Sequence, residues 1–159
     1  MTDEKKPLLA VRDLKVYYPI KVRSRGIISQ RKLVRAVDGI SFDVYEGETL
    51  GIVGESGCGK STTGKTIVRL NRPTAGSVTY DGMDLFSCPP QAQARISREI
   101  QIVFQDPYSS LDPRFTVGRS IAEPLVVHKA GAPAERRARV VELMRAGGLR
   151  EGVYARYPH

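Results

Sequence analysis

A glycine-rich stretch between an apolar run and a helix-forming run constrains this chain more than any other feature. It reads Gly54-Glu55-Ser56-Gly57-Cys58-Gly59-Lys60-Ser61-Thr62 and fits the phosphate-loop pattern G-x-x-x-x-G-K-[ST]. Glycines let successive backbone N–H groups turn toward phosphate oxygens, and the N-terminus of a following helix adds partial positive charge. The run Thr49–Val53 predicts the strand that this motif needs before it, and Thr62–Leu70 predicts the helix after it. We therefore predict a nucleotide site, in preference to a glycine-rich turn that binds nothing.

Two side chains of this stretch have predicted roles in holding a nucleotide. Lys60 would reach the β- and γ-phosphates as a point charge, and the Ser61 hydroxyl would take one coordination position on Mg²⁺. The expected cofactors are therefore ATP and Mg²⁺.

Composition and charge narrow the class of protein. At 159 residues, with 41% hydrophobic and 26% charged residues, the chain has the size and composition of one ordinary globular domain. No apolar run approaches the ~20 residues of a membrane span, and the polar start has no signal-peptide core. The cysteines Cys58 and Cys88 form no metal-binding spacing, and we expect no disulfide. The net charge of +8 fits nucleic acid or an anionic membrane as a partner, but a solvated basic face is favoured.

Alternating apolar residues predict an N-terminal β-structure. Leu8–Tyr18 reads as a strand with one irregularity near Asp13, and Val34–Tyr45 as a second strand with Ile40, Phe42 and Val44 on one face. Between them, Pro19–Leu33 holds five basic and no acidic residues, and its Gly26 and Ser29 predict a loop. This segment is either a solvated hairpin tip or a contact with lipid headgroups or a partner protein.

Further along, the pattern changes to that of an α/β core followed by helices. Thr49–Val53 and Glu99–Phe104 are apolar enough to be buried parallel strands, and Ser77–Tyr80 is a short strand before an Asp81-Gly82 turn. The predicted helices are Gln91–Arg98, Thr116–Ile121, stopped before Pro124, and Ala134–Ala146, stopped by Gly147-Gly148. In the last of these, Ala138, Val141 and Met144 are expected to line the buried face, with Arg136, Arg137 and Arg139 outside it.

The 159 residues do not supply everything that a P-loop enzyme needs. Such an enzyme places an acidic residue at the end of an apolar strand to hold Mg²⁺. Only Asp106 comes near that position, but Gln105 separates it from the strand and Pro107 follows, so Asp106 is not the expected ligand. Because the last residues carry neither a helix stop nor a closing strand, we expect a chain that is cut at His159.

Taken together, these stretches resemble the ATP-binding subunits of ABC transporters, and within that family the oligopeptide/dipeptide importers. The phosphate loop alone would fit any P-loop NTPase, whereas the block Val103–Pro113 is specific to the peptide-importer branch. The resemblance covers nearly the whole chain. It is carried by the loop and three further segments: Ala36–Phe42, Ile102–Arg114 and Arg156–His159.

The resemblance assigns roles by position. Tyr17 and Tyr18 either cover a core or offer a ring to a base, and the resemblance implies that Tyr18 stacks on adenine, with Tyr17 as the fallback. It implies that Gly54–Thr62 cradle the phosphates. Gln105 matches the Q-loop glutamine, which approaches Mg²⁺ and the attacking water. Lys60 and Gln105 are thus the expected catalytic residues, and Ser61 and Gln105 the expected metal ligands.

The resemblance also implies an architecture and a function. The expected fold is an α/β P-loop NTPase of the ABC ATPase type: an antiparallel β-subdomain and partial RecA-like core over 1–105, and a partial helical subdomain over 106–159. The family's LSGGQ signature, Walker B acid, catalytic glutamate and switch histidine are absent from these residues. The parent protein is expected to couple ATP hydrolysis to peptide import at the cytoplasmic face of the membrane, with this chain alone binding nucleotide weakly and not hydrolysing it.

The implied partners are transmembrane permease subunits, a second ATP-binding subunit and, indirectly, a periplasmic or lipid-anchored solute-binding protein; nucleic acid is not expected. Two alternatives remain open: a P-loop ATPase acting on nucleic acid, and a non-catalytic interaction fragment. Cys58 carries a smaller hypothesis, that alkylation of its thiol blocks nucleotide binding, against the alternative that cysteine is only a small residue in that position.

Overall fold

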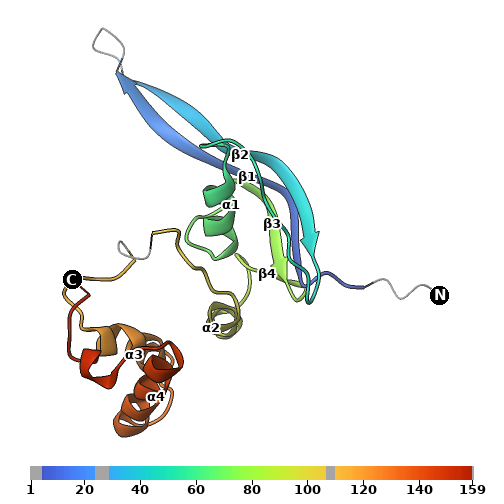
Figure 1. Cartoon of the computed structure of the whole chain (residues 1–159). Helices are drawn as coiled ribbons and strands as arrows, with labels where there is room; N and C mark the ends of the chain where they lie inside the picture. The colour runs from blue at the N-terminus through green and yellow to red at the C-terminus, as the bar shows by residue number, and fades with distance from the viewer. Residues whose placement is uncertain (1–4, 24–28, 107–109, 159) are drawn as a thin grey trace. The chain divides into compact units, whose positions relative to one another are not determined.

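The computed structural model describes residues 5–23, 29–106 and 110–158 (Figure 1). The chain divides into two compact units, Met1–Ile102 and Val103–His159, and each is described by itself. The prediction that a single incomplete domain spans the chain, with a division at residue 105, stays a prediction.

The described part of the first unit contains a four-stranded antiparallel sheet in the order β2-β1-β3-β4. Its strands are β1 (Leu9–Arg23), β2 (Ser29–Val44), β3 (Ala75–Tyr80) and β4 (Met83–Asp84). The strands predicted at Leu8–Tyr18, Val34–Tyr45 and Ser77–Tyr80 are confirmed as β1, β2 and β3. However, β1 and β2 continue far into Pro19–Leu33, which was predicted to be a loop. The reason is that the two strands keep one register from Tyr17↔Arg35 to Arg23↔Ser29, so each residue added extends the ladder. Gly26 lies outside the described residues.

A bulge at Asp13 explains how β1 keeps one face buried. Asp13 has a φ of 45°, and the register with β2 shifts between Val11 and Leu14. The Asp13 N–H donates to the Ser41 hydroxyl at 2.8 Å, away from the regular ladder. The extra residue returns Leu14 and Val16 to the same buried face as Val11, which strict alternation would not do. The irregularity predicted near Asp13 is confirmed.

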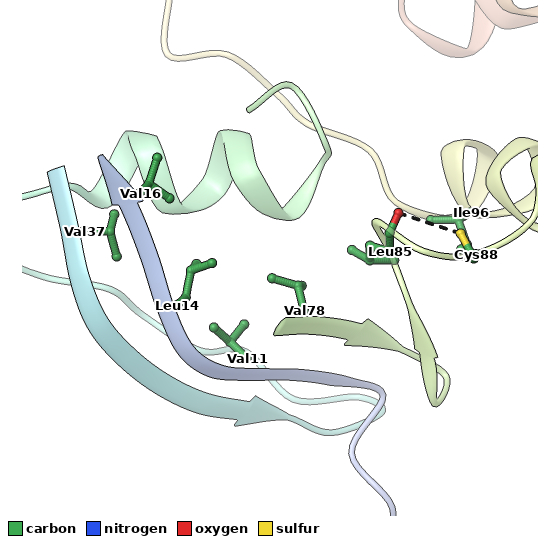
Figure 2. Packing of buried hydrophobic residues seen from close by; sticks show 8 residues of the cluster. All are labelled: Val11, Leu14, Val16, Val37, Val78, Leu85, Cys88 and Ile96. Carbon is green, nitrogen blue, oxygen red and sulfur yellow. Dashed lines mark hydrogen bonds between the residues drawn. The ribbon is translucent and has the colours of Figure 1, made fainter. Parts of the chain in front are cut away.

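The core of the first unit lies on one face of this sheet. Figure 2 shows its buried side chains, from β1, β2 and β3 to the segment after β4 and helix α2; they are Val11, Leu14, Val16, Val37, Val78, Leu85, Cys88 and Ile96. Helix α1 spans Lys60–Ile67 and helix α2 spans Pro90–Glu99, and Ile67 and Ala92 pack against this cluster. Helix α1 ends before the predicted Leu70 because Arg69 turns into the left-handed region, at a φ of 64°.

The two predicted buried parallel strands are wrong for the described chain. Residues 49–53 and 101–104 form no strand, and their apolar side chains are exposed: Val53 by 94% and Val103 by 96%. A parallel strand needs hydrogen-bonded neighbours and a covering layer on both faces. Among the described residues, no strand pairs with these two segments and no layer covers both of their faces. Their apolar side chains therefore have no sheet in which to be buried.

The second unit is helical in its described part. Helix α3 spans Val117–Val127, helix α4 spans Pro133–Ala146, and a short 3₁₀ turn, η1, spans Glu151–Val153. The Ala132 N–H donates to the Glu135 carboxylate at 2.7 Å at the start of α4. The predicted stop at Gly147-Gly148 is confirmed, with Gly148 at a φ of 75°.

Two predictions about these helices are wrong. Helix α3 does not stop before Pro124 but continues to Val127, because the proline removes one donor only and the His128 N–H closes the last turn on the Pro124 carbonyl. Of the three residues predicted to line the buried face of α4, only Met144 is confirmed as buried; Val141 is half-buried, and Val140, which was not predicted, is fully buried. Val140 and Met144 lie four positions apart and therefore share one face of the helix, whereas Ala138 is exposed. Within the described ranges, no helix has the length and apolar character to span a membrane.

Candidate nucleotide-binding site

The predicted phosphate loop leads directly into the first turn of helix α1. Gly59 is the N-cap of this helix with a φ of 101°, and Gly57 has a φ of 82°. Both angles lie in the region that side chains disfavour, so this loop needs glycine at both positions. The sequence pattern and the backbone therefore agree on where the loop turns.

The Lys60 side chain folds back into the phosphate loop that precedes it. Its Nζ donates to the carbonyl oxygens of Gly54 and Glu55, at 2.7 Å each, and lies 3.5 Å from the Cys58 Sγ. Lys60 is the first residue of α1, so its side chain reaches back over the helix N-terminus. A full positive charge and the positive end of a helix dipole therefore meet at one point, which is the electrostatic requirement for a bound polyphosphate.

The helix start provides one oxygen suited to a hard cation. Ser61 is exposed in the first turn of α1, and that turn contains no acidic side chain. The next hydroxyls behave differently, because Thr63 and Thr66 are buried and their Oγ1 atoms donate to carbonyls one turn back, at 3.1 and 2.8 Å. Among the described residues, no group of three or more His, Cys, Asp or Glu could hold a metal ion. These donors fit Mg²⁺ held by one protein hydroxyl together with nucleotide phosphates.

Two neighbouring aromatic residues on β1 have different surroundings. The Tyr17 hydroxyl donates to Asp38, and the Arg35 guanidinium lies 5.6 Å from the centre of the Tyr17 ring. This hydrogen bond lowers the pKa of Asp38, with help from Arg35, and it raises the pKa of Tyr17 together with desolvation. Tyr18 is exposed and lies opposite Val34 in the ladder. Of the two rings, Tyr18 is therefore the one that presents an open face.

The residues Gly54–Thr62 lie together in one loop, whereas Gln105 lies in the other compact unit of the chain. Lys60 and Tyr18 belong to the first unit, whereas Gln105 and Asp106 follow the boundary at Ile102 and belong to the second. Gln105 is exposed at the end of the segment 101–106. The assignment of Gln105 to Mg²⁺ and water therefore stays a prediction.

Both cysteines are free, as expected. Cys58 is exposed in the loop, and Cys88 is buried in the core with its Sγ 3.7 Å from the Leu85 carbonyl oxygen, the contact drawn in Figure 2.

Sequence reasoning missed two contacts near the site. Ala36 of β2 presents its carbonyl oxygen to Gly59, and Asp38 holds Tyr17. Both contacts depend on the register between β1 and β2 and on where α1 packs. No local pattern encodes these, although both residues lie in the segment Ala36–Phe42 that carries the resemblance.

The fold and this loop define the class of protein: a P-loop NTPase, in which a glycine loop and the N-terminus of a helix surround a lysine ammonium. Comparisons narrow the class further. The profile of the ABC transporter family matches residues 37–157, so the chain belongs to the ABC transporter family.

Among curated relatives, the chain is 45% identical over 153 residues to the dipeptide transport ATP-binding protein DppF of Escherichia coli K12. It is also 45% identical over 155 residues to the oligopeptide transport ATP-binding protein AppF of Bacillus subtilis 168. Each match covers 96% of this chain but 45% and 46% of the relative. The chain thus spans about half the length of the curated relatives it matches.

Solved structures agree with the predicted fold class. The dimeric ATP-binding cassette MJ0796, in a post-hydrolysis state bound to ADP and Pi, superposes with a TM-score of 0.71 at 26% identity. The match covers 94% of this chain and 61% of that chain. The α/β fold of the ABC ATPase type, present in part, is therefore confirmed.

Proposed function

We propose that this chain is the nucleotide-binding part of an ATP-binding subunit that couples ATP hydrolysis to the import of oligopeptides or dipeptides. The observation that carries this proposal is the Lys60 ammonium, held at 2.7 Å from two loop carbonyls at the start of α1. The names of the relatives, which are dipeptide and oligopeptide transport ATP-binding proteins, support the peptide as the transported solute.

The residues of the site then have the following proposed roles. When a nucleotide binds, the Lys60 ammonium exchanges the carbonyl oxygens of Gly54 and Glu55 for the β- and γ-phosphates. The charged phosphate oxygens attract an ammonium more strongly than neutral carbonyl oxygens do. Backbone N–H groups of Gly54–Thr62 hold the phosphates, and the Ser61 hydroxyl takes one position on Mg²⁺. When bound, Mg²⁺ would neutralise part of the negative charge of the phosphates. Tyr18 would stack on adenine, and Gln105 would approach Mg²⁺ and the attacking water.

The proposed surroundings of the subunit are those that the family resemblance implies. The subunit would lie at the cytoplasmic face of the cell membrane as a peripheral protein, in contact with transmembrane permease subunits and a second ATP-binding subunit. A periplasmic or lipid-anchored solute-binding protein would be an indirect partner. Nucleic acid is not a proposed partner.

The 159-residue chain on its own has a more limited proposed activity: weak nucleotide binding without hydrolysis. Its residues include the phosphate loop but no LSGGQ signature and no apolar strand that ends in a metal-binding acid and a general base. Holding phosphates needs only the loop, whereas cleaving the γ-phosphate needs a positioned water and a complete metal shell.

Calorimetric titration with Mg²⁺·ATP tests this proposal. Replacing Lys60 by alanine removes charge-assisted hydrogen bonds, so we expect affinity to fall by about 10-fold to 100-fold. Lys65→Ala is the matched control, because Lys65 is an exposed lysine in the last turn of the same helix. Equal affinity in the two variants would overturn the proposed site. A turnover that scales with protein purity and is lost in Lys60→Ala would overturn the proposed lack of hydrolysis.

A further inference from the structure

The far end of the β1–β2 hairpin carries a concentrated positive charge that the nucleotide site does not use. We call Pro19–Lys21 of β1 and Arg31–Leu33 of β2 the basic ribbon. Its cross-strand pairs are Pro19↔Leu33, Ile20↔Lys32 and Lys21↔Arg31. Figure 1 shows this end of the hairpin extending beyond helix α1 of the same unit.

One face of the basic ribbon combines two cations with two apolar side chains. Residues directly opposite in an antiparallel ladder point to the same face, and alternate residues share it. Pro19 and Leu33 therefore share a face with Lys21 and Arg31. All four are exposed, Leu33 by 64%. A hollow of about 240 Å³ lies at this end of the hairpin, lined by Pro19, Ile20, Lys21 and Arg31.

Within the part of the chain that the structure describes, the charges on this face have no ion-pair partner. Like charges directly opposite each other in a sheet are destabilising, and Lys21 stands opposite Arg31. Across the described residues, no carboxylate forms an ion pair with Lys21, Arg31 or Lys32. The sequence from Pro19 to Arg35 contains no acidic residue at all. An external anion between the two cations would turn a repulsive pair into an attractive site.

We propose that this face of the basic ribbon binds the phosphate headgroups of an anionic phospholipid bilayer. Lys21 and Arg31 would contact headgroup phosphates, and Pro19 and Leu33 would enter the boundary between headgroups and acyl chains. The aliphatic neighbours favour a bilayer over nucleic acid, because binding of single strands relies on aromatic rings for stacking and the ribbon has none. This inference rests on the proposed position of the protein beside a membrane.

Vesicle co-sedimentation of the whole chain tests the inference. The vesicles are pure phosphatidylcholine, or equal parts of phosphatidylcholine and phosphatidylglycerol, at physiological ionic strength. We expect binding only with phosphatidylglycerol. Because each cation near an anionic surface contributes about fivefold to partitioning, Lys21→Gln/Arg31→Gln should bind about 25-fold more weakly. Leu33→Ser should bind severalfold more weakly, because insertion loses its apolar side chain.

Two control variants separate the site from net charge and from misfolding. Lys65→Gln/Arg72→Gln removes the same charge from exposed positions elsewhere in the first unit and should bind as the unmodified chain does. Lys21→Arg/Arg31→Lys keeps the charge and should also bind normally. Equal loss in the ribbon variant and the Lys65/Arg72 variant would overturn the inference. Binding to duplex DNA that is lost in the ribbon variant, without binding to vesicles, would assign the face to nucleic acid instead.

A Mg²⁺·ATP titration of the same proteins keeps the two proposals distinguishable. The ribbon variants should keep the nucleotide affinity of the unmodified chain. Normal ATP binding without vesicle binding would remove only the bilayer site, and vesicle binding without ATP binding would remove only the nucleotide site.

Discussion

A Cβ atom added at Gly59 would lie 2.3 Å from the carbonyl oxygen of Ala36. This contact joins the phosphate loop to strand β2, and the φ of 101° at Gly59 points the loop toward the start of α1. The position of the Lys60 ammonium therefore depends on a glycine for two reasons, backbone conformation and space.

Gly59→Ala should destabilise the first unit by about 3 kcal/mol or more, because alanine meets both a left-handed backbone and a backbone oxygen that cannot move aside. Urea denaturation measures the change. Gly64→Ala is the control within the same helix: its Cβ would meet nothing within 4 Å, and the site is helical. It should stabilise by about 0.5–1 kcal/mol. Similar stability of the two variants would contradict the packing described for Gly59.

Tyr18→Ala should weaken binding of Mg²⁺·ATP by about tenfold, because an aromatic platform contributes roughly 1–3 kcal/mol per stacked base. Tyr17→Phe should leave the affinity unchanged, since it removes only the hydroxyl that Asp38 binds. Titration of both variants with ATP and with inorganic triphosphate measures the difference. If Tyr18→Ala binds both ligands like the unmodified chain, adenine does not stack on Tyr18.

The phosphate loop and the turns and bulge of the antiparallel sheet could be predicted from the sequence because their signals are local. The glycine spacing fixes the turn at Gly57 and Gly59, the slip in alternation marks the bulge at Asp13, and Asp81-Gly82 has the positive φ angles of a tight turn. In each case a few adjacent residues determine the backbone.

The rest depends on contacts between distant segments. The runs at 49–53 and 101–104 have the composition of buried strands, but burial needs neighbours that the pattern itself cannot supply. The contact of Ala36 with Gly59 depends on how α1 packs on β2. The end of α3 after Pro124 depends on the bond from His128 to Pro124.

The exposed apolar segments lead to a prediction about solubility and stability. Val103→Ser should raise the solubility of the chain and change the free energy of unfolding by less than about 0.5 kcal/mol, because the side chain is 96% exposed. Val140→Ser, at a fully buried site of α4, should destabilise strongly. Melting curves and concentration limits measure both. If the chain without ligand melts cooperatively at high temperature and Val103→Ser lowers this melting temperature, the segment around Val103 is packed and the prediction is contradicted.

Asp112 gives a prediction for pH dependence in the second unit. Hydrogen bonds from the Arg114 side chain and backbone lower the pKa of Asp112 from 3.8 to about 2. A lowered pKa in the folded state means that this interaction stabilises fully above pH 3.8 and is lost as the pH falls from 3.8 to about 2. NMR titration of the Asp112 carboxyl group should show the low value, and Arg114→Gln should raise it. An Asp112 that titrates alike in both proteins would contradict the pairing.

The most direct test of the nucleotide site is the alkylation rate of Cys58 with and without Mg²⁺·ATP. Cys58 is exposed in the loop beside Lys60, whereas Cys88 is buried and serves as an internal reference. We predict that Mg²⁺·ATP slows alkylation of Cys58 but not of Cys88, and that this protection disappears in Lys60→Ala. A Cys58 rate that stays the same at every ATP concentration would contradict the central claim that this loop holds the phosphates.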